Sequence, residues 1–196
     1  MLTPEERISV YTFFSLQYQR VIEGQFLDFE FTKATIDTPE VTEQAYYEVI
    51  GRKTADLIAA STGVPGIIAN VDQAEQRALF NFGYQLGIGY QLADDILSIW
   101  GNTEKTGKDA HGDIRERKKT IPIIRLYTES DQDTKKRITM LYKNKGQLSE
   151  IDIDYIRSKL DEGGFYERMC TELTNTLART YGCIDQLSLQ SEKKQI

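Results

Sequence analysis

The stretch Phe82–Pro122, FGYQLGIGYQLADDILSIWGNTEKTGKDAHGDIRERKKTIP, decides the fold and the chemistry of this chain. It sets two adjacent carboxylates, Asp94 and Asp95, among the apolar residues of a predicted helix and follows them with a segment rich in Lys, Gly and Asp. An uncompensated charge is costly to bury in an apolar wall. The sequence therefore predicts a cation partner for the two aspartates.

Four oxygen-bearing side chains fall near one face of this helix, because positions three and four apart are neighbours: Gln91, Asp94, Asp95 and Ser98. Such donors suit Mg2+, which is usually bound by one or two carboxylates together with water and substrate phosphates. A softer metal is not indicated, since the chain offers one histidine, His111, and two distant cysteines. For the aspartate pair alone, a capped or solvated helix end stays an open alternative.

Further polar residues flank the pair on both sides. Downstream, glycines, two cations and a third carboxylate are suited to cradle a polyanion: Gly107, Lys108, Asp113, Lys118, Thr120 and Pro122. Upstream, Lys53 and Thr54 lie in a second predicted amphipathic helix. Taken singly, Lys53 fits a solvated helix face and Lys118 a solvated charge cluster within RERKK. The ordered pattern, and no single residue, carries the functional interpretation.

This pattern resembles the trans-type polyprenyl (isoprenyl) diphosphate synthases, whose second aspartate-rich segment reads FQxxDDxLD and is followed by GK, an aspartate-containing loop and KxTxP. Tyr90 and Gln91 match the F-Q pair, and Asp94 with Asp95 matches the double aspartate. The loop is matched by Lys108, Asp113, Lys118, Thr120 and Pro122. Upstream, GQFLDFEF resembles the family's GQxxD element through Gly24, Gln25 and Asp28, and Lys53 with Thr54 resembles its K-T element. The matches follow the family's order.

The resemblance implies a prenyltransferase of isoprenoid biosynthesis that uses Mg2+ to join isopentenyl diphosphate to an allylic prenyl diphosphate. It implies that Asp94 and Asp95 bind the metal, with Asp113 behind them. It also implies that three lysines contact the diphosphate groups: Lys53, Lys108 and Lys118. Gln91 and Thr54 would lie beside the substrate or its reacting carbons.

The resemblance further implies an all-α helical bundle of the isoprenoid-synthase type, with two departures. Ser98 stands where the motif has its last aspartate, so a hydroxyl replaces a charge. The family's first aspartate-rich motif would precede Gly24, where only Met1–Glu23 stand. We therefore expect a bundle that is incomplete at its N-terminal side, and product chain length, which the family sets largely beside that first motif, is not predictable.

Three interpretations stay open. The chain is part of a synthase, including one half of a split enzyme; or it is a non-catalytic or regulatory subunit, which Ser98 and the absent first motif favour. An unrelated helical protein that binds Mg2+ or diphosphate would need the ordered motifs to arise by chance. The helices missing from the bundle would leave an exposed apolar groove. Because large apolar patches usually mark a partner surface, a homo- or hetero-oligomer is expected.

Composition sets the remaining bounds. The 196 residues are of single-domain size, and we expect one helical domain over 1–196. A net charge of -6 and a pI near 5.0 argue against a nucleic-acid partner. Cys170 and Cys183 are too few for a disulfide framework, which fits a reducing, cytoplasmic location. The acidic start MLTPEERISVYTFF is unlike a signal peptide, and no apolar run has the length of a membrane span.

Capping signals and periodicity predict helices and no strands. One helix is expected from Thr3 and Pro4 to about Phe31, a second from Thr38 to a stop near Gly63 and Pro65, and a third from Asp72 to Trp100. After a polar loop over 102–119, shorter helices are expected at Ile121–Tyr127, Thr134–Lys143, Ile151–Asp161 and Phe165–Leu189. Three glycines in the third helix indicate a close helix approach or room for a ligand: Gly83, Gly87 and Gly89.

Overall fold

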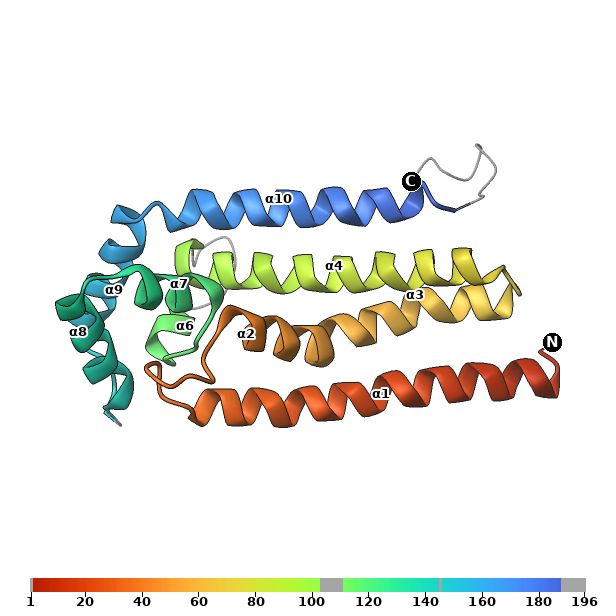
Figure 1. The fold of residues 1–196 in the computed structure, drawn as a ribbon, viewed down its shortest axis with the longest axis horizontal. Coiled ribbons are helices and arrows are strands. Elements are labelled where there is room, and N and C mark those ends of the chain that lie inside the picture. Colours follow the sequence, from red (N-terminus) through yellow and green to blue (C-terminus); the bar gives the residue numbers. More distant parts are fainter. Residues whose placement is uncertain (1, 103–110, 145, 188–196) are drawn as a thin grey trace. The chain divides into compact units, whose positions relative to one another are not determined.

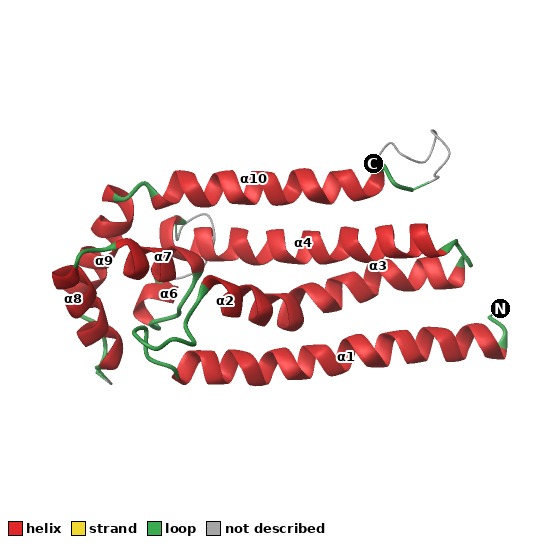
Figure 2. Cartoon of the chain, in the orientation of Figure 1, coloured by secondary structure: helices red, strands yellow, loops and turns green. Residues whose placement is uncertain are grey.

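The computed structural model describes residues 2–102, 111–144 and 146–187, and every regular element among these residues is a helix. Figure 1 follows the helices along the chain, and Figure 2 shows helix and loop without a strand in the described part. The elements are α1 (Pro4–Lys33), α2 (Glu43–Ile50), the π-helical turn η1 (Gly51–Ala55), α3 (Asp56–Ile68), α4 (Gln73–Trp100), α6 (Gly112–Arg115), α7 (Ile121–Glu129), α8 (Gln132–Lys143), α9 (Glu150–Glu162) and α10 (Phe165–Ile184). The predicted all-α class is confirmed.

The described residues divide into two compact units. Unit 1 takes in those within 1–25, 50–90 and 174–196, and unit 2 takes in those within 26–49 and 91–173. Helices α1, α4 and α10 therefore contribute residues to both units, as does α2, whose last residue, Ile50, belongs to unit 1. Each unit has its own internal packing, and the single-domain expectation stays a prediction.

Side-chain caps set the starts of the two longest helices where the sequence places them. At the start of α1, the Thr3 hydroxyl accepts from the Glu6 backbone N–H at 3.2 Å and the Glu6 carboxylate accepts from the Thr3 N–H at 2.7 Å. This reciprocal capping box satisfies two donors that a helix start leaves unpaired. At the start of α4, Asp72 accepts from the N–H groups of Ala74 and Glu75 at 2.8 and 2.9 Å.

The second helix starts later than predicted. Thr38 lies in a turn whose carbonyl accepts from the Val41 N–H at 3.1 Å. Helix α2 begins at Glu43, because the Thr42 hydroxyl accepts from the Ala45 N–H at 3.1 Å and so caps the first turn. The Thr-Pro-Glu start signal at Thr38 was wrong by one turn.

The predicted stop near Gly63 and Pro65 was also wrong, since α3 continues to Ile68 with Pro65 inside it. A Cβ at Gly63 would lie 2.8 Å from Cζ of Phe13 on α1. This glycine therefore lies in close contact with α1 within unit 1 and does not end the helix. Tertiary packing overrides the breaker signals here, although proline still removes one helical hydrogen bond.

The middle of the second helix is a π-helical turn, η1, which carries Lys53 and Thr54. Gly24 of α1 lies directly against its backbone, since a Cβ there would be 2.8 Å from the Arg52 carbonyl carbon and 2.8 Å from the Lys53 Cα. Single π-helical turns are frequent at functional sites. The glycine of the GQxxD element thus supports the turn that holds the K-T element.

Two of the three glycines predicted to mark a close approach do so on α4. A Cβ at Gly83 would lie 2.7 Å from the Ala59 Cα, and one at Gly87 would lie 2.5 Å from the Ala55 Cα. Both partners are fully buried. Small residues on both helices therefore let α4 approach η1 and α3 within unit 1.

Unit 2 has an apolar core drawn from the later helices and the connection after α1. Its fully buried side chains include Ile99 of α4, Ile114 of α6 and Ile153 of α9. The four predicted later helices are present with ends shifted by a few residues, and α6 adds a short helix inside the segment predicted as a loop. This packing joins the segment after the aspartate pair to the rest of unit 2.

Cys170 and Cys183 are both free thiols. Among the residues that the structure describes, no helix combines the length and the apolar character that crossing a bilayer requires.

Replacing Gly24 with alanine should destabilise the protein, because the added methyl group meets backbone atoms of η1, which cannot move aside as a side chain can. Overpacking of this kind costs about 1–3 kcal/mol, partly offset by the ~1 kcal/mol helix propensity that alanine gains over glycine. Thermal melting followed by circular dichroism should show a Tm lower by about 2–6 °C.

Gly182→Ala is the matched control, since Gly182 lies in α10 with no atom within 4 Å of the added methyl group. Its Tm should be unchanged or higher. A Gly24→Ala protein that melts with or above the wild type would contradict the close approach of α1 to η1.

Candidate functional site

Asp95 is a buried carboxyl group in the middle of an apolar helix. Its side chain on α4 belongs to a residue that is only 2% exposed, and both of its oxygens accept hydrogen bonds. The hydroxyl of Tyr46 on α2 donates to Oδ2, and Nε2 of Gln91, one turn earlier on α4, donates to Oδ1 at 3.1 Å. Both donors belong to unit 2 with Asp95.

The surroundings of Asp95 make its carboxyl group harder to ionise than that of a free aspartate. Burial raises the pKa of Asp95 to about 7, against the hydrogen bonds from Tyr46 and Gln91, and the carboxylates of Asp113 and Asp94 raise it further. Burial and the charge of Asp95 raise the pKa of Tyr46 well above its usual range, so Tyr46 remains a donor. A nearby cation would offset the repulsion among these carboxylates.

Asp94 differs from its neighbour in exposure. It is half-buried, whereas Asp95 is buried, although the two are adjacent in the same turn of α4. Of the two aspartates, Asp94 has the greater access to solvent and hence to a ligand. Asp94 is therefore the outer carboxylate of the pair, and Asp95 is the inner one.

The loop carboxylate Asp113 is attached to α4 through Ser98. The Asp113 backbone N–H donates to the Ser98 hydroxyl at 3.0 Å, and both residues are buried. His111, just before α6, has a positive φ of 66°, and its Nδ1 lies 2.8 Å from the Ile99 carbonyl oxygen. These contacts hold the start of α6 against the turn of α4 that follows the aspartate pair.

Lys118 pairs with Asp113. Its ammonium group lies 2.9 Å from Asp113 Oδ1 and 3.2 Å from a carboxylate oxygen of Glu116. Although burial opposes the shift, the hydrogen bonds and charges of Asp113 and Glu116 raise the pKa of Lys118. The side chain is 52% exposed, so a charged lysine stands between the buried Asp113 and solvent.

Lys119 is a residue that sequence reasoning missed. It is buried, donates to the Thr32 carbonyl at 2.9 Å, and interacts electrostatically with Asp28 of the GQxxD element. Burial lowers the pKa of Lys119, and the charge of Asp28 opposes that effect. The available signal was its position inside the KxTxP match, where Thr120 precedes α7 and Pro122 lies in its first turn.

Tyr46 is the second missed residue. Its sequence signal was weak, since a tyrosine among apolar helix positions is usually a core residue. Its neighbour Tyr47 donates to Glu172, and Arg125 binds Glu43 through two contacts of 3.1 and 2.7 Å. These side chains attach α2 to α7 and α10 within unit 2.

The other predicted site residues are not brought together with this cluster by the described contacts. Lys53 and Thr54 are half-buried in η1 and belong to unit 1, whereas Asp94 belongs to unit 2. A shared cavity for them stays a prediction. Lys108 lies outside the described residues.

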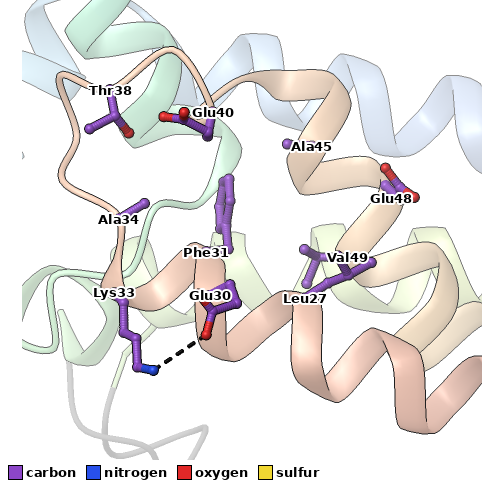
Figure 3. Close-up of a pocket in the computed structure, with 10 residues that line it drawn as sticks. All are labelled: Leu27, Glu30, Phe31, Lys33, Ala34, Thr38, Glu40, Ala45, Glu48 and Val49. Atoms are coloured by element: carbon purple, nitrogen blue, oxygen red, sulfur yellow. Dashed lines mark hydrogen bonds and ion pairs between the residues drawn. The ribbon is translucent and has the colours of Figure 1, made fainter.

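A pocket of about 480 Å3 lies elsewhere in unit 2. Figure 3 shows it between the end of α1, the following connection and α2, with Leu27, Phe31 and Val49 among its apolar lining residues. Lys33 and Glu30 form an ion pair of 3.3 Å at its edge. None of the residues predicted for the site lines this pocket.

The carboxylates around Asp95 offer oxygen donors, which a hard cation prefers. Its acidic groups supply only oxygen donors, and no group of three or more His, Cys, Asp or Glu suited to hold a metal occurs among the described residues. Such a donor set is incomplete by itself. It suits Mg2+, which takes few protein carboxylates and completes its octahedron with water and phosphate oxygens.

Comparisons with known proteins agree with the helical motifs. A model of the polyprenyl synthetase family matches residues 1–160. Geranylgeranyl diphosphate synthase from Sulfolobus acidocaldarius is 31% identical over 197 residues, covering 100% of this chain and 56% of that protein. The same-named synthase from Saccharolobus solfataricus is 36% identical over 140 residues, covering 71% of this chain and 41% of that protein.

Solved structures show the same fold. The crystal structure of geranylgeranyl pyrophosphate synthetase from Pyrococcus horikoshii matches with a TM-score of 0.84 and 25% identity, covering 97% of this chain and 56% of that one. The chain therefore spans about half the length of the curated relatives it matches. With the family model matching most of its residues, the chain belongs to the polyprenyl synthetase family of trans-type prenyl diphosphate synthases.

Proposed function

We propose that this chain supplies the leaving-group side of a Mg2+-dependent prenyltransferase site, which condenses isopentenyl diphosphate with an allylic prenyl diphosphate. The observation that carries the proposal is the cluster of Asp95, Asp113 and Lys118, drawn from α4 and from the segment around α6. Asp94 is the outer carboxylate beside it. Family membership supports the reaction class.

In this proposal the aspartate pair, Asp94 and Asp95, holds Mg2+, with Asp113 behind it. Mg2+ when bound would stabilise the negative charge that develops on the departing diphosphate. Lys118 adds a half-exposed positive charge next to Asp113. Lys53 and Lys108 are proposed as further diphosphate contacts, and Gln91 and Thr54 as residues beside the substrate.

The proposed reaction needs no nucleophile from the protein. The carbon–oxygen bond of the allylic diphosphate breaks and leaves an allylic cation and diphosphate. The double bond of isopentenyl diphosphate attacks that cation, and the resulting cation loses a proton, which the departed diphosphate accepts. The protein's part is to position charges and exclude water from the cation.

A non-catalytic subunit, or one half of a split enzyme, is the second candidate. One observation favours it: Ser98 replaces a carboxylate with a hydroxyl that holds the Asp113 backbone. The assay that separates the candidates measures prenyl transfer by the purified chain alone. Turnover by the chain alone supports an enzyme, and turnover that needs a second polypeptide supports a subunit or half-enzyme.

Binding of Mg2+ and diphosphate should be coupled in the wild-type protein, since an ion shared by protein and phosphate oxygens is favoured by both partners. Asp94→Ala should remove that coupling and weaken Mg2+ binding in the presence of inorganic diphosphate by at least about tenfold. Isothermal titration calorimetry with and without diphosphate measures the effect. Asp154→Ala, on the exposed face of α9, is the control and should bind as the wild type does. Equal binding by wild type and Asp94→Ala would refute the metal site.

Lys118→Gln should weaken binding of inorganic diphosphate in the presence of Mg2+ by about fivefold to tenfold, because a charge-assisted contact is lost and the charge of Asp113 is less well balanced. Because Lys118 is 52% exposed, solvent screening should keep the loss of folding stability within about 1 kcal/mol. Lys136→Gln, at an exposed pair on α8, is the matched control. Unchanged diphosphate affinity in Lys118→Gln would exclude Lys118 from the site.

A further inference from the structure

Tyr46 is the one buried side chain outside α4 that is seen, among the described residues, to donate a hydrogen bond to Asp95. The residue is 5% exposed, and its hydroxyl on α2 donates to Asp95 Oδ2. A phenol has a single O–H to donate, so this donor is committed to the aspartate. The contact links residues 49 positions apart and lies wholly within unit 2.

The helix that carries Tyr46 is firmly anchored. Arg125 of α7 binds both carboxylate oxygens of Glu43 at 3.1 and 2.7 Å, and it also binds Glu172 of α10 at 2.6 Å. The Arg125 side chain is only 15% exposed, whereas the side chains of Glu43 and Glu172 are 44% and 23% exposed, so the guanidinium is the shielded partner of these ion pairs. A paired guanidinium fork of this kind restricts geometry as well as adding attraction. The first turn of α2, next to Tyr46, is therefore held in place by these ion pairs.

Asp95 is held from two sides, which leaves it no edge open to solvent. Gln91 donates to Oδ1 while Tyr46 donates to Oδ2, and the residue is 2% exposed. Asp94, next to it, is half-buried. Asp95 can therefore act through its charge and its hydrogen bonds, whereas Asp94 is accessible to a ligand.

We propose that Tyr46 is a positioning residue for the metal site: by fixing the inner carboxylate Asp95 against α2, it sets the orientation in which α4 presents Asp94 to Mg2+ and diphosphate. This inference rests on the proposed function and refines it: within the aspartate pair Asp94 is the direct ligand, Asp95 acts through its charge and its hydrogen bonds, and Tyr46 is added to the site. In this role Tyr46 acts without touching the metal or the substrate. Its effect passes through Asp95.

The test compares two adjacent tyrosines that both donate to carboxylates. Tyr46→Phe keeps the ring and removes the donor to Asp95, while Tyr47→Phe removes the donor to Glu172 and leaves the ion pairs of Arg125 in place. Calorimetric titration of Mg2+ in the presence of inorganic diphosphate should show about fivefold to tenfold weaker binding for Tyr46→Phe. Tyr47→Phe should bind as the wild type does.

A double-mutant cycle distinguishes positioning from a general loss of structure. If Tyr46 acts through Asp95, Tyr46→Phe should weaken binding little further once Asp95→Ala has removed the acceptor of its hydrogen bond. Fully additive losses would overturn the proposal, as would a Tyr46→Phe protein that binds like Tyr47→Phe.

Asp95→Asn alone provides a second test that does not depend on the folding of Tyr46→Phe. It keeps an acceptor oxygen for Tyr46, so it should lose less Mg2+ affinity than Asp94→Asn. Equal losses would make Asp95 a ligand of the same kind as Asp94 and overturn the positioning role. Failure of the proposed function has a different signature, in which Asp94→Asn binds as the wild type does.

Discussion

The burial of Asp95 is the constraint on which the arrangement of unit 2 depends. Its neighbours on α4 include Leu92 and Ile99, both fully buried, and Asp95 itself is only 2% exposed. A buried polar group must find hydrogen-bond partners within the protein. Gln91 supplies one from α4, and the other comes from Tyr46, which ties the position of α2 to that of α4. An apolar residue at position 95 would pack in the same space without any demand on α2.

Unit 1 depends on a different constraint, the size of the side chains where its helices meet. Gly24 lies against the backbone of η1, and Gly87 lies against Ala55 at the end of the same turn. Relative to an α-helix, a π-helical turn holds an extra residue, which rotates the following side chains by about 100° around the axis. Lys53 sits inside this turn, and its backbone lies so close to α1 that only glycine fits at position 24. Gly24 of the GQxxD element and Lys53 of the K-T element are thus in close contact in the structure, as well as ordered in the sequence.

Local signals in the sequence were sufficient for the class of the fold and for most helices. Caps such as Asp72 depend on neighbours a few residues away, and a sequence contains that information. The errors arose where distant contacts override local ones: Gly63 indicates a stop unless Phe13 is known to press against it. The same distinction separates the site residues. The double aspartate is visible as a motif, whereas Tyr46 becomes visible only when α2 and α4 are brought together. The roles of the matched residues, and a cavity shared with Lys53, remain predictions.

Ser98 departs from the family's motif, yet its hydroxyl accepts a hydrogen bond that the fold needs. The position lies one turn after Asp94 and Asp95, is 8% exposed, and accepts a hydrogen bond from the backbone of Asp113. An aspartate there would add a third buried negative charge near Asp95 and Asp113, whose carboxylates already repel each other. With a serine, the same backbone N–H is satisfied by a neutral acceptor, and the repulsion falls. The hydroxyl therefore preserves the attachment of α6 to α4 and brings less negative charge to the surroundings of Asp95 and Asp113 than an aspartate would.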